Sequence, residues 1–137
     1  MKATIELQQN VNFKATSGSG HSFQMDGPPD YGGQDLGSRP MEVMLMGMGG
    51  CASFDVVHIL RKRRLVVADC VTEIEAERAD IDPKVFVKIH LHFKVSGEGL
   101  TEKAVGKAVE LSAEKYCSAS IMLAKTADVT HSFEIID

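Results

Sequence analysis

Three cysteines, at positions 51, 70 and 117, are the most reactive side chains of the sequence. A thiolate is a nucleophile and a metal ligand, and a thiol near the N-terminus of a helix ionises more easily. Cys70 lies in a strand-like segment, where a cysteine usually serves as a small packed apolar residue. Cys51 lies in a glycine-rich helical segment, and Cys117 lies where one helical segment ends and another begins. These two are the candidates for thiol chemistry, although a buried, inert thiol is the competing interpretation of either one alone.

Helical geometry places two other polar side chains beside Cys51. At about 100° per residue, Asp55 and His58 lie within about 40° of Cys51 around the helix axis. An aspartate next to a thiol raises the pKa of the thiol. His58 is two turns away, ~10 Å along the axis, which is too far to take the thiol proton directly. We therefore expect Asp55 and His58 to form a structural ion pair rather than to complete a catalytic triad with Cys51.

The histidines do not follow a metal-binding pattern. The sequence contains no CxxC, HExxH or HxxxH motif. His90 and His92 are two residues apart and so share one face of a strand, a face that is more often solvated than ligating. We expect no metal and no other cofactor.

An alternation of strands and helices positions these candidates. Residues 2–26 are expected to form three short strands, with SGSG at 17–20 as a turn. Residues 27–39 contain four glycines and two prolines and predict a loop. A long helix is expected from Pro40, after a Ser38 cap, to about residue 63. The remaining expected elements are strands at 69–79, 84–96 and 129–136, a helix from Thr101, and a short helix or bent continuation at 117–127. This order predicts one α+β domain over residues 1–137, with an antiparallel sheet packed against a buried long helix.

The composition limits the partners and the compartment. A net charge of −4 over 137 residues argues against nucleic acid and against an anionic membrane as partner. No targeting segment is apparent, and no apolar stretch approaches the ~20 residues of a membrane helix. An odd number of widely spaced cysteines does not form a secreted disulfide framework. We therefore expect a cytoplasmic protein whose thiols are kept reduced.

Gly47, Gly49 and Gly50 come just before Cys51 in the long helix, although a glycine in a helix interior costs about 1 kcal/mol relative to alanine. Without side chains over most of a turn, this surface lets another backbone approach closely. The same helix is rich in methionine, which adapts to irregular partners and to apolar ligands, with ordinary core packing as the other interpretation.

The segment PMEVMLMGMGGC and the later segment SAEKYCSASIML together resemble the OsmC/Ohr family, and in particular its short YhfA-like branch. The family is named for osmotic induction and organic hydroperoxide resistance, and the resemblance covers nearly the whole chain. It implies an OsmC-like α+β fold and an intertwined homodimer, with the glycine-bearing helices buried and the active sites at the subunit interface. Characterised members are thiol peroxidases that reduce organic hydroperoxides and are recycled by a dithiol reductant.

By match of motif, the resemblance implies that Cys51 is the peroxidatic cysteine and Cys117 the resolving cysteine. The implied chemistry is a sulfenic acid on Cys51 followed by a Cys51–Cys117 disulfide. Glu42, one residue beyond the position that the peroxidases give to a glutamate, is included in the implied catalytic site. The peroxidases also use an arginine from the N-terminal strands, but residues 1–38 contain none, and Arg39 is the nearest guanidinium. This difference favours the alternative, a non-catalytic dimer of the same fold that binds an apolar small molecule or senses redox state.

Overall fold

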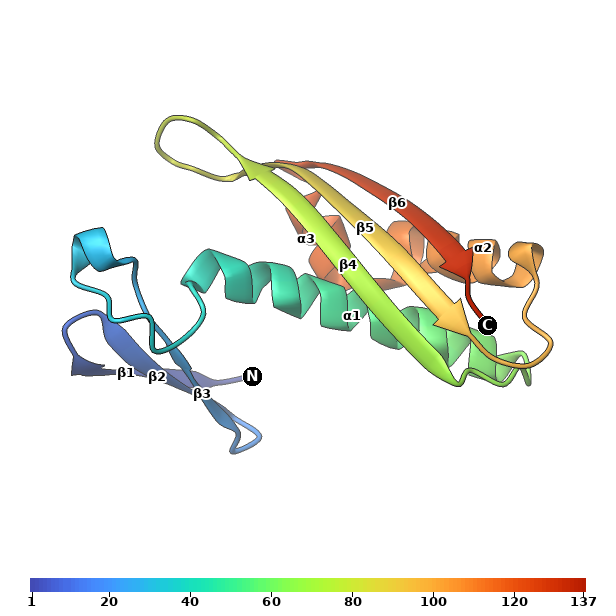
Figure 1. Ribbon diagram of the computed structural model, residues 1–137, viewed down its shortest axis with the longest axis horizontal. Helices are drawn as coiled ribbons and strands as arrows, with labels where there is room; N and C mark the ends of the chain where they lie inside the picture. The colour runs from blue at the N-terminus through green and yellow to red at the C-terminus, as the bar shows by residue number, and fades with distance from the viewer. The chain divides into compact units, whose positions relative to one another are not determined.

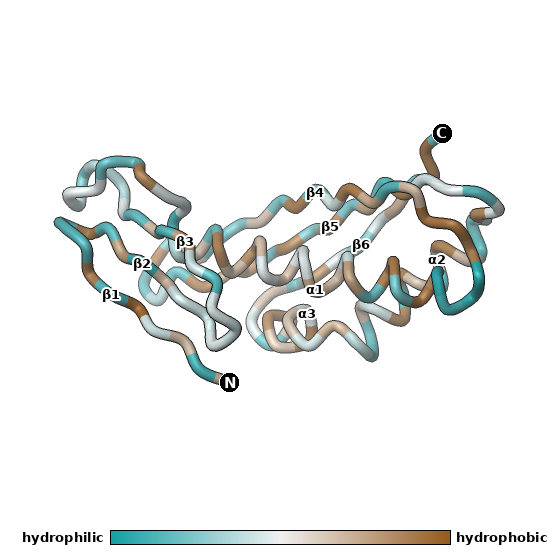
Figure 2. Tube along the Cα trace, turned by 90° about the horizontal axis from the view of Figure 1, so that it is seen from below, coloured by the Kyte–Doolittle hydropathy of each residue, from teal (hydrophilic) through white to brown (hydrophobic).

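The computed structural model describes residues 1–137, which fall into two compact units, Met1–Met46 and Gly47–Asp137. The first unit contains an antiparallel sheet of three strands, β1 (Ala3–Gln9), β2 (Asn12–Ser17) and β3 (Ser22–Met25), in that order. Polar and apolar residues alternate along β1 (Figure 2). Every residue of β1 is exposed, so the apolar side chains of Ile5 and Leu7 are more than half accessible. The first unit therefore leaves apolar surface uncovered.

The buried carboxylate of Asp26 orders the predicted loop at residues 27–39. Its oxygens accept hydrogen bonds from the backbone N–H groups of Gly27, Gln34 and Leu36 at 2.8, 3.1 and 3.1 Å. These bonds, with that from Leu36 the foremost, lower the pKa of Asp26. The loop includes a 3₁₀ turn at Pro29–Tyr31 and leads into the long helix α1 (Pro40–Lys62). The helix begins and ends within one residue of its predicted bounds.

The second unit has two layers (Figure 1). Its sheet has the strand order β4, β5, β6, and helices cover one face of it. The strands are β4 (Asp69–Arg78), β5 (Phe86–Ser96) and β6 (Asp128–Ile135). The helices are α1 from Gly47 onward, α2 (Glu102–Leu111) and α3 (Ser118–Leu123), and a π-helical turn at Ser112–Tyr116 follows α2.

The core of this unit lies between the sheet and the helices. Alternate residues of β5 are buried, while every fourth residue of one α1 stripe is buried, as strand and helix periods require. These residues are Ile89, Leu91, Phe93 and Val95 of β5, and Met48, Ala52, Val56 and Leu60 of α1. The predicted α+β class, with a long helix packed on a sheet, is confirmed.

One strand pairing differs from the prediction of an antiparallel sheet. β4 and β5 are antiparallel, but β6 pairs with β5 in parallel. The chain between β5 and β6 passes through α2 and α3, and such a helical crossover returns the chain to the starting end of the sheet. The second sheet is therefore mixed.

By length and composition alone, α1 is long and apolar enough to cross a membrane. The statement that no apolar stretch approaches this length is therefore wrong. The core helix of a globular domain passes the same test, and α1 packs one stripe beneath the sheet, although only 28% of its apolar window is buried.

Candidate functional site

The glycine-rich turn before Cys51 has one packed side and one open side. A methyl group built on Gly49 would come within 2.5 Å of Ile74 Cδ1, so this side of α1 lies close against β4. Methyl groups built on Gly47 or Gly50 would meet no atom within 4 Å. The close neighbour at Gly49 is thus a side chain of the sheet and not the backbone that the glycines predict, and the surface at Gly47 and Gly50 is open within the chain.

Cys117 is fully buried between the π-helical turn and α3. Its backbone N–H donates to the Ser112 carbonyl at 2.8 Å, a hydrogen bond over five residues that the π turn makes possible. Its sulfur accepts hydrogen bonds from the Ser120 hydroxyl at 3.1 Å and from the Ser120 backbone N–H at 3.4 Å. The thiol is therefore held in one position by its own helix.

The Ser112 hydroxyl joins this turn to α1. It lies 3.4 Å from the Ala52 carbonyl oxygen and 3.4 Å from Asp55 Oδ2, to which it can donate. The contact brings three chemically active atoms together, since Cys51 Sγ, Cys117 Sγ and a carboxylate oxygen of Asp55 all lie within 4.8 Å of one another. The two candidate cysteines are thus adjacent in space, with both thiols free.

Burial controls the protonation of these groups. It raises the pKa of Cys117, the neighbouring Cys51 thiol adds to the rise, and the hydrogen bonds from Ser120 oppose it. Burial also raises the pKa of Asp55, against the opposing effects of the Ser112 hydrogen bond and of nearby His58. Cys70, outside the cluster, is partly buried and has its pKa raised by burial as well, in keeping with a packed strand cysteine.

His58 does not form the predicted ion pair with Asp55, because none of the ion pairs within 4.0 Å joins these residues. Its ring stacks on Phe54 instead, with the ring centroids 5.7 Å apart. Phe54 lies four residues before His58 on α1 and Asp55 lies three residues before it, so helical geometry brings both side chains within reach of the ring. The Asp55 carboxylate instead lies beside the two cysteines and can accept the hydrogen bond from Ser112.

A cavity of about 370 Å³ opens beside Asp55. The end of α1 contributes Lys62 and Arg63 to its lining, and α2 and the π turn contribute Leu111 and Tyr116. The cavity combines apolar walls with two cationic side chains. Of the three cluster residues, only Asp55 lines this cavity.

Glu42 and Arg39 lie at the start of α1, in the first unit, and form hydrogen bonds there. The Glu42 carboxylate accepts a hydrogen bond from the Arg39 backbone N–H at 2.9 Å, one half of a capping box. The Arg39 guanidinium pairs with Asp35 at 3.2 Å and donates to the Gly37 carbonyl at 3.3 Å. The catalytic role of Glu42 stays a prediction.

Two site residues, Ser112 and Ser120, were missed by reasoning from the sequence. Ser120 follows Cys117 by three residues, the spacing of a helix N-cap and its N3 position, and Cys117 is the N-cap of α3. That signal was present in the sequence. Ser112 carried no such signal, because its role depends on the π turn.

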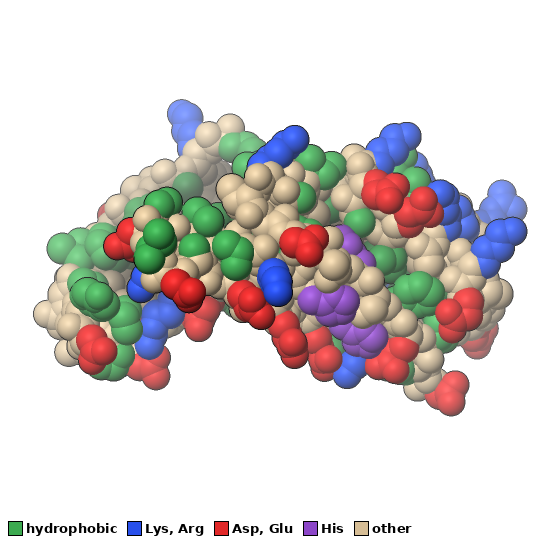
Figure 3. All heavy atoms as spheres, turned by 90° about the horizontal axis from the view of Figure 1, so that it is seen from above, with side chains coloured by type: hydrophobic (Ala, Val, Ile, Leu, Met, Phe, Trp, Pro, Cys, Tyr) green, Lys and Arg blue, Asp and Glu red, His purple; other side chains and the backbone are tan.

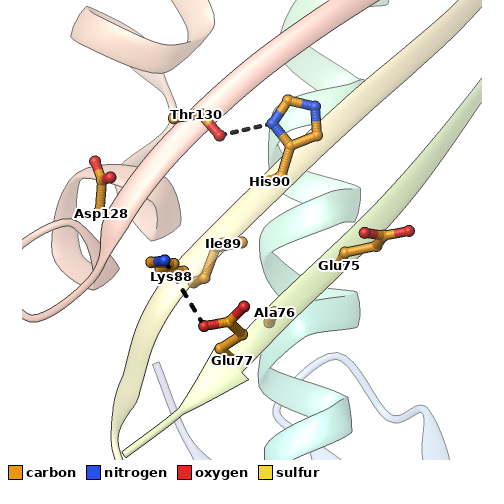
Figure 4. Close-up of a pocket in the computed structure, with 8 residues that line it drawn as sticks. All are labelled: Glu75, Ala76, Glu77, Lys88, Ile89, His90, Asp128 and Thr130. Carbon is orange, nitrogen blue, oxygen red and sulfur yellow. Dashed lines mark hydrogen bonds and ion pairs between the residues drawn. The ribbon is translucent and has the colours of Figure 1, made fainter.

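The sheet face that the helices leave uncovered is polar, with histidines gathered between acidic side chains (Figure 3). Neighbouring strands place Glu73 opposite His92 and Glu75 opposite His90. A shallow cavity of about 260 Å³ lies on this face, where the side chains of Lys88 and Glu77 approach to 4.0 Å (Figure 4). The predicted solvated face is confirmed.

Four hydrogen bonds connect the two histidines to β6 in a row that we call the histidine ladder. His90 Nδ1 lies 2.6 Å from Thr130 Oγ1, and His90 Nε2 lies 2.8 Å from Ser132 Oγ. His92 Nδ1 lies 2.7 Å from the same Ser132 oxygen, and His92 Nε2 lies 3.3 Å from Glu134. The ladder occupies the donor and acceptor atoms of both rings.

Comparisons with known proteins agree with this architecture. The family model described as OsmC-like protein matches residues 32–132. The Escherichia coli K12 protein YhfA is 43% identical over 136 residues, covering 99% of this chain and 98% of YhfA. A solved structure of a hypothetical protein from Aquifex aeolicus VF5 is 30% identical over 98% of this chain and 95% of its own, with a TM-score of 0.86.

A Legionella pneumophila structure, described as an organic hydroperoxide resistance protein OsmC, shares the fold at a TM-score of 0.73 and 18% identity. It covers 97% of this chain and 95% of its own. The chain belongs to the OsmC-like family, in which relatives of the same fold include proteins named for organic hydroperoxide resistance.

Proposed function

We propose that the chain is a thiol-dependent peroxidase that reduces organic hydroperoxides. The observation that carries the proposal is the approach of Cys51 Sγ and Cys117 Sγ to within 4.8 Å, since the two thiols come from separate helical segments. A disulfide requires a sulfur–sulfur bond of about 2.05 Å. A modest movement of one side chain would close the gap.

The proposed reaction assigns a step to each thiol. The Cys51 thiolate attacks the terminal peroxide oxygen, the O–O bond breaks, and the alkoxide leaves as the alcohol after taking a proton. Cys51 is then a sulfenic acid. The Cys117 thiolate attacks the Cys51 sulfur, hydroxide leaves as water after protonation, and the Cys51–Cys117 disulfide forms. An external dithiol reduces the disulfide and restores both thiols.

The cavity beside Asp55 is the proposed substrate pocket. The side chains of Ile59, Leu111 and Tyr116 give it apolar walls that suit an alkyl hydroperoxide better than hydrogen peroxide. By match of motif with the family, Glu42 is proposed as a further catalytic residue. The proposed compartment is the cytoplasm, where a dithiol reductant is available.

The proposed assembly is a homodimer. In the first unit, an apolar groove of about 450 Å³ is lined by residues of the sheet and the following loop, among them Ile5, Phe13 and Met25. Exposed apolar surface of this kind favours association. A second copy of the chain is the proposed occupant, as in the intertwined dimers of the family.

A second candidate function is redox sensing or small-molecule binding without turnover. The raised pKa of the buried Cys117 thiol favours it, because a protonated thiol is a poor nucleophile. Native mass spectrometry separates the two functions. A retained ligand or adduct on a protein without peroxidase turnover would support the second.

The direct test is hydroperoxide consumption in the presence of a small dithiol. We expect turnover by the wild type, loss of turnover in Cys51→Ser, and accumulation of a Cys51 sulfenic acid in Cys117→Ser. Cys70→Ser, which removes a thiol outside the cluster, should keep wild-type activity. A wild-type rate no higher than that of Cys51→Ser with every alkyl hydroperoxide tried would end the peroxidase proposal.

A further inference from the structure

The cluster that holds the two thiols also has the composition of a metal site. Cys51 Sγ, Cys117 Sγ and an Asp55 carboxylate oxygen lie within 4.8 Å of one another. Tetrahedral zinc, with Zn–S bonds of about 2.3 Å and Zn–O bonds of about 2.1 Å, holds such ligands roughly 3.4–3.8 Å apart. Shifts of about 1 Å would therefore bring all three atoms onto one ion.

Hydrogen bonds from two neighbouring serines already orient two of the three ligands. The Ser120 hydroxyl and backbone N–H both point at Cys117 Sγ, at 3.1 and 3.4 Å. The Ser112 hydroxyl is placed to donate to Asp55 Oδ2 and leaves Oδ1 available. Such donors fix the direction of metal ligands and stabilise thiolate and carboxylate charge.

The Asp55 carboxylate has no cationic partner within 4.0 Å among the ion pairs of the chain. Two thiolates and a carboxylate packed this closely would repel one another. A divalent cation that displaces the thiol protons would offset this repulsion.

From this geometry we infer that the reduced chain binds one Zn²⁺ ion through Cys51, Asp55 and Cys117. Thiolate ligands select zinc over magnesium and calcium, which prefer oxygen. Three protein ligands leave the fourth position of the ion for water, as in open zinc sites, and the cavity beside Asp55 provides an entry path. Binding releases the two thiol protons, and a Cys51–Cys117 disulfide removes both sulfur ligands, so zinc and the disulfide exclude one another.

The test titrates the reduced, full-length protein with Co²⁺ in the absence of oxygen, then displaces the ion with Zn²⁺. Cobalt reports its ligands through thiolate-to-metal charge-transfer absorbance. We expect one ion per chain, an absorbance that indicates two thiolates, and an affinity that rises with pH because protons must leave. Treatment with an oxidant that forms the disulfide should release the ion.

Variants locate the ion. Cys51→Ser should lose the two-thiolate absorbance, Asp55→Asn should keep it with at least tenfold weaker affinity, and Cys70→Ser should match the wild type. Asp55→Asn also provides a test if Cys117→Ser, at a fully buried position, fails to fold. Cobalt bound without thiolate absorbance, or an absorbance lost in Cys70→Ser and kept in Cys51→Ser, would overturn the inference.

The metal titration uses no peroxide, so its outcome is separate from that of the peroxidase assay. A protein that binds zinc without turnover would retain this inference and lose the proposed function. A protein that reduces hydroperoxides but binds neither Co²⁺ nor Zn²⁺ would retain the proposed function and lose this inference.

Discussion

Replacing Ser120 by alanine removes the O–H donor that lies 3.1 Å from Cys117 Sγ and leaves the backbone N–H donor at 3.4 Å in place. A hydrogen bond to a charged group contributes about 1.5–3 kcal/mol. Since one pKa unit corresponds to about 1.36 kcal/mol, the pKa of Cys117 should rise by about one to two units in Ser120→Ala. The pKa rises because the hydrogen bond that is removed stabilises the thiolate, whereas the burial that raises the pKa is unchanged.

The assay follows thiolate ultraviolet absorbance against pH in a background of Cys51→Ala and Cys70→Ala, where Cys117 is the sole thiol. Ser118→Ala is the matched control, because Ser118 is the exposed first residue of the same helix. A pKa in Ser120→Ala equal to or below that in Ser118→Ala would refute the role of this hydrogen bond.

The same substitution has a kinetic consequence for disulfide formation. A rise of one pKa unit lowers the thiolate fraction about tenfold near neutral pH, but it raises the nucleophilicity of the thiolate about threefold. With Cys51 and Cys117 both present, closure of the disulfide from the sulfenic acid should slow by about threefold in Ser120→Ala. Stopped-flow measurement of sulfenic acid decay would detect this change, and an unchanged rate would mean that ionisation of Cys117 does not limit closure.

Two further substitutions test the second unit. Burial lowers the pKa of His131, so the unfolded chain takes up this proton first as the pH falls. The free energy of unfolding should therefore decrease below pH ~6.5, by up to about 1.4 kcal/mol per pH unit. His131→Phe should flatten that slope in urea denaturation relative to the exposed His21→Gln, and an unchanged slope would contradict the assignment. Gly50→Ala adds a methyl group that meets no atom of its own chain within 4 Å, so helix propensity should raise the free energy of unfolding of the separated chain by about 1 kcal/mol. The same methyl group should weaken the proposed dimer in analytical ultracentrifugation. A dimer of unchanged affinity would mean that no partner covers this surface.

Local periodicity in the sequence was enough to predict the main elements. The alternation along β5 and the length and basic end of α1 predicted both elements to within about two residues, although Arg39 rather than the predicted Ser38 directly precedes the helix and takes part in its cap. The direction of β6 was not predictable in this way. Parallel pairing depends on the path of the α2–α3 crossover, whereas the residue pattern of β6 is the same in either direction.

The candidate site was predictable only where it follows one helix. Cys51 and Asp55 are one turn apart, so their shared face follows from helical geometry. Their contact with Cys117 depends on how the π turn packs against α1, which no local pattern encodes. His58 had two partners at helical spacing, Asp55 and Phe54, and the stacking with Phe54 prevailed.

The histidine ladder on the open face of the sheet has a direction. A Glu134 carboxylate can only accept, so His92 carries its proton on Nε2 and its Nδ1 accepts from the Ser132 hydroxyl. That hydroxyl has a single proton, so it must accept from His90 Nε2, and the Thr130 hydroxyl in turn donates to His90 Nδ1. One carboxylate thus fixes two tautomers and two hydroxyl rotors. A proton added to His92 Nδ1 would make that atom a donor and turn the Ser132 hydroxyl away from it, so the change would reach His90 through the one oxygen that both rings contact.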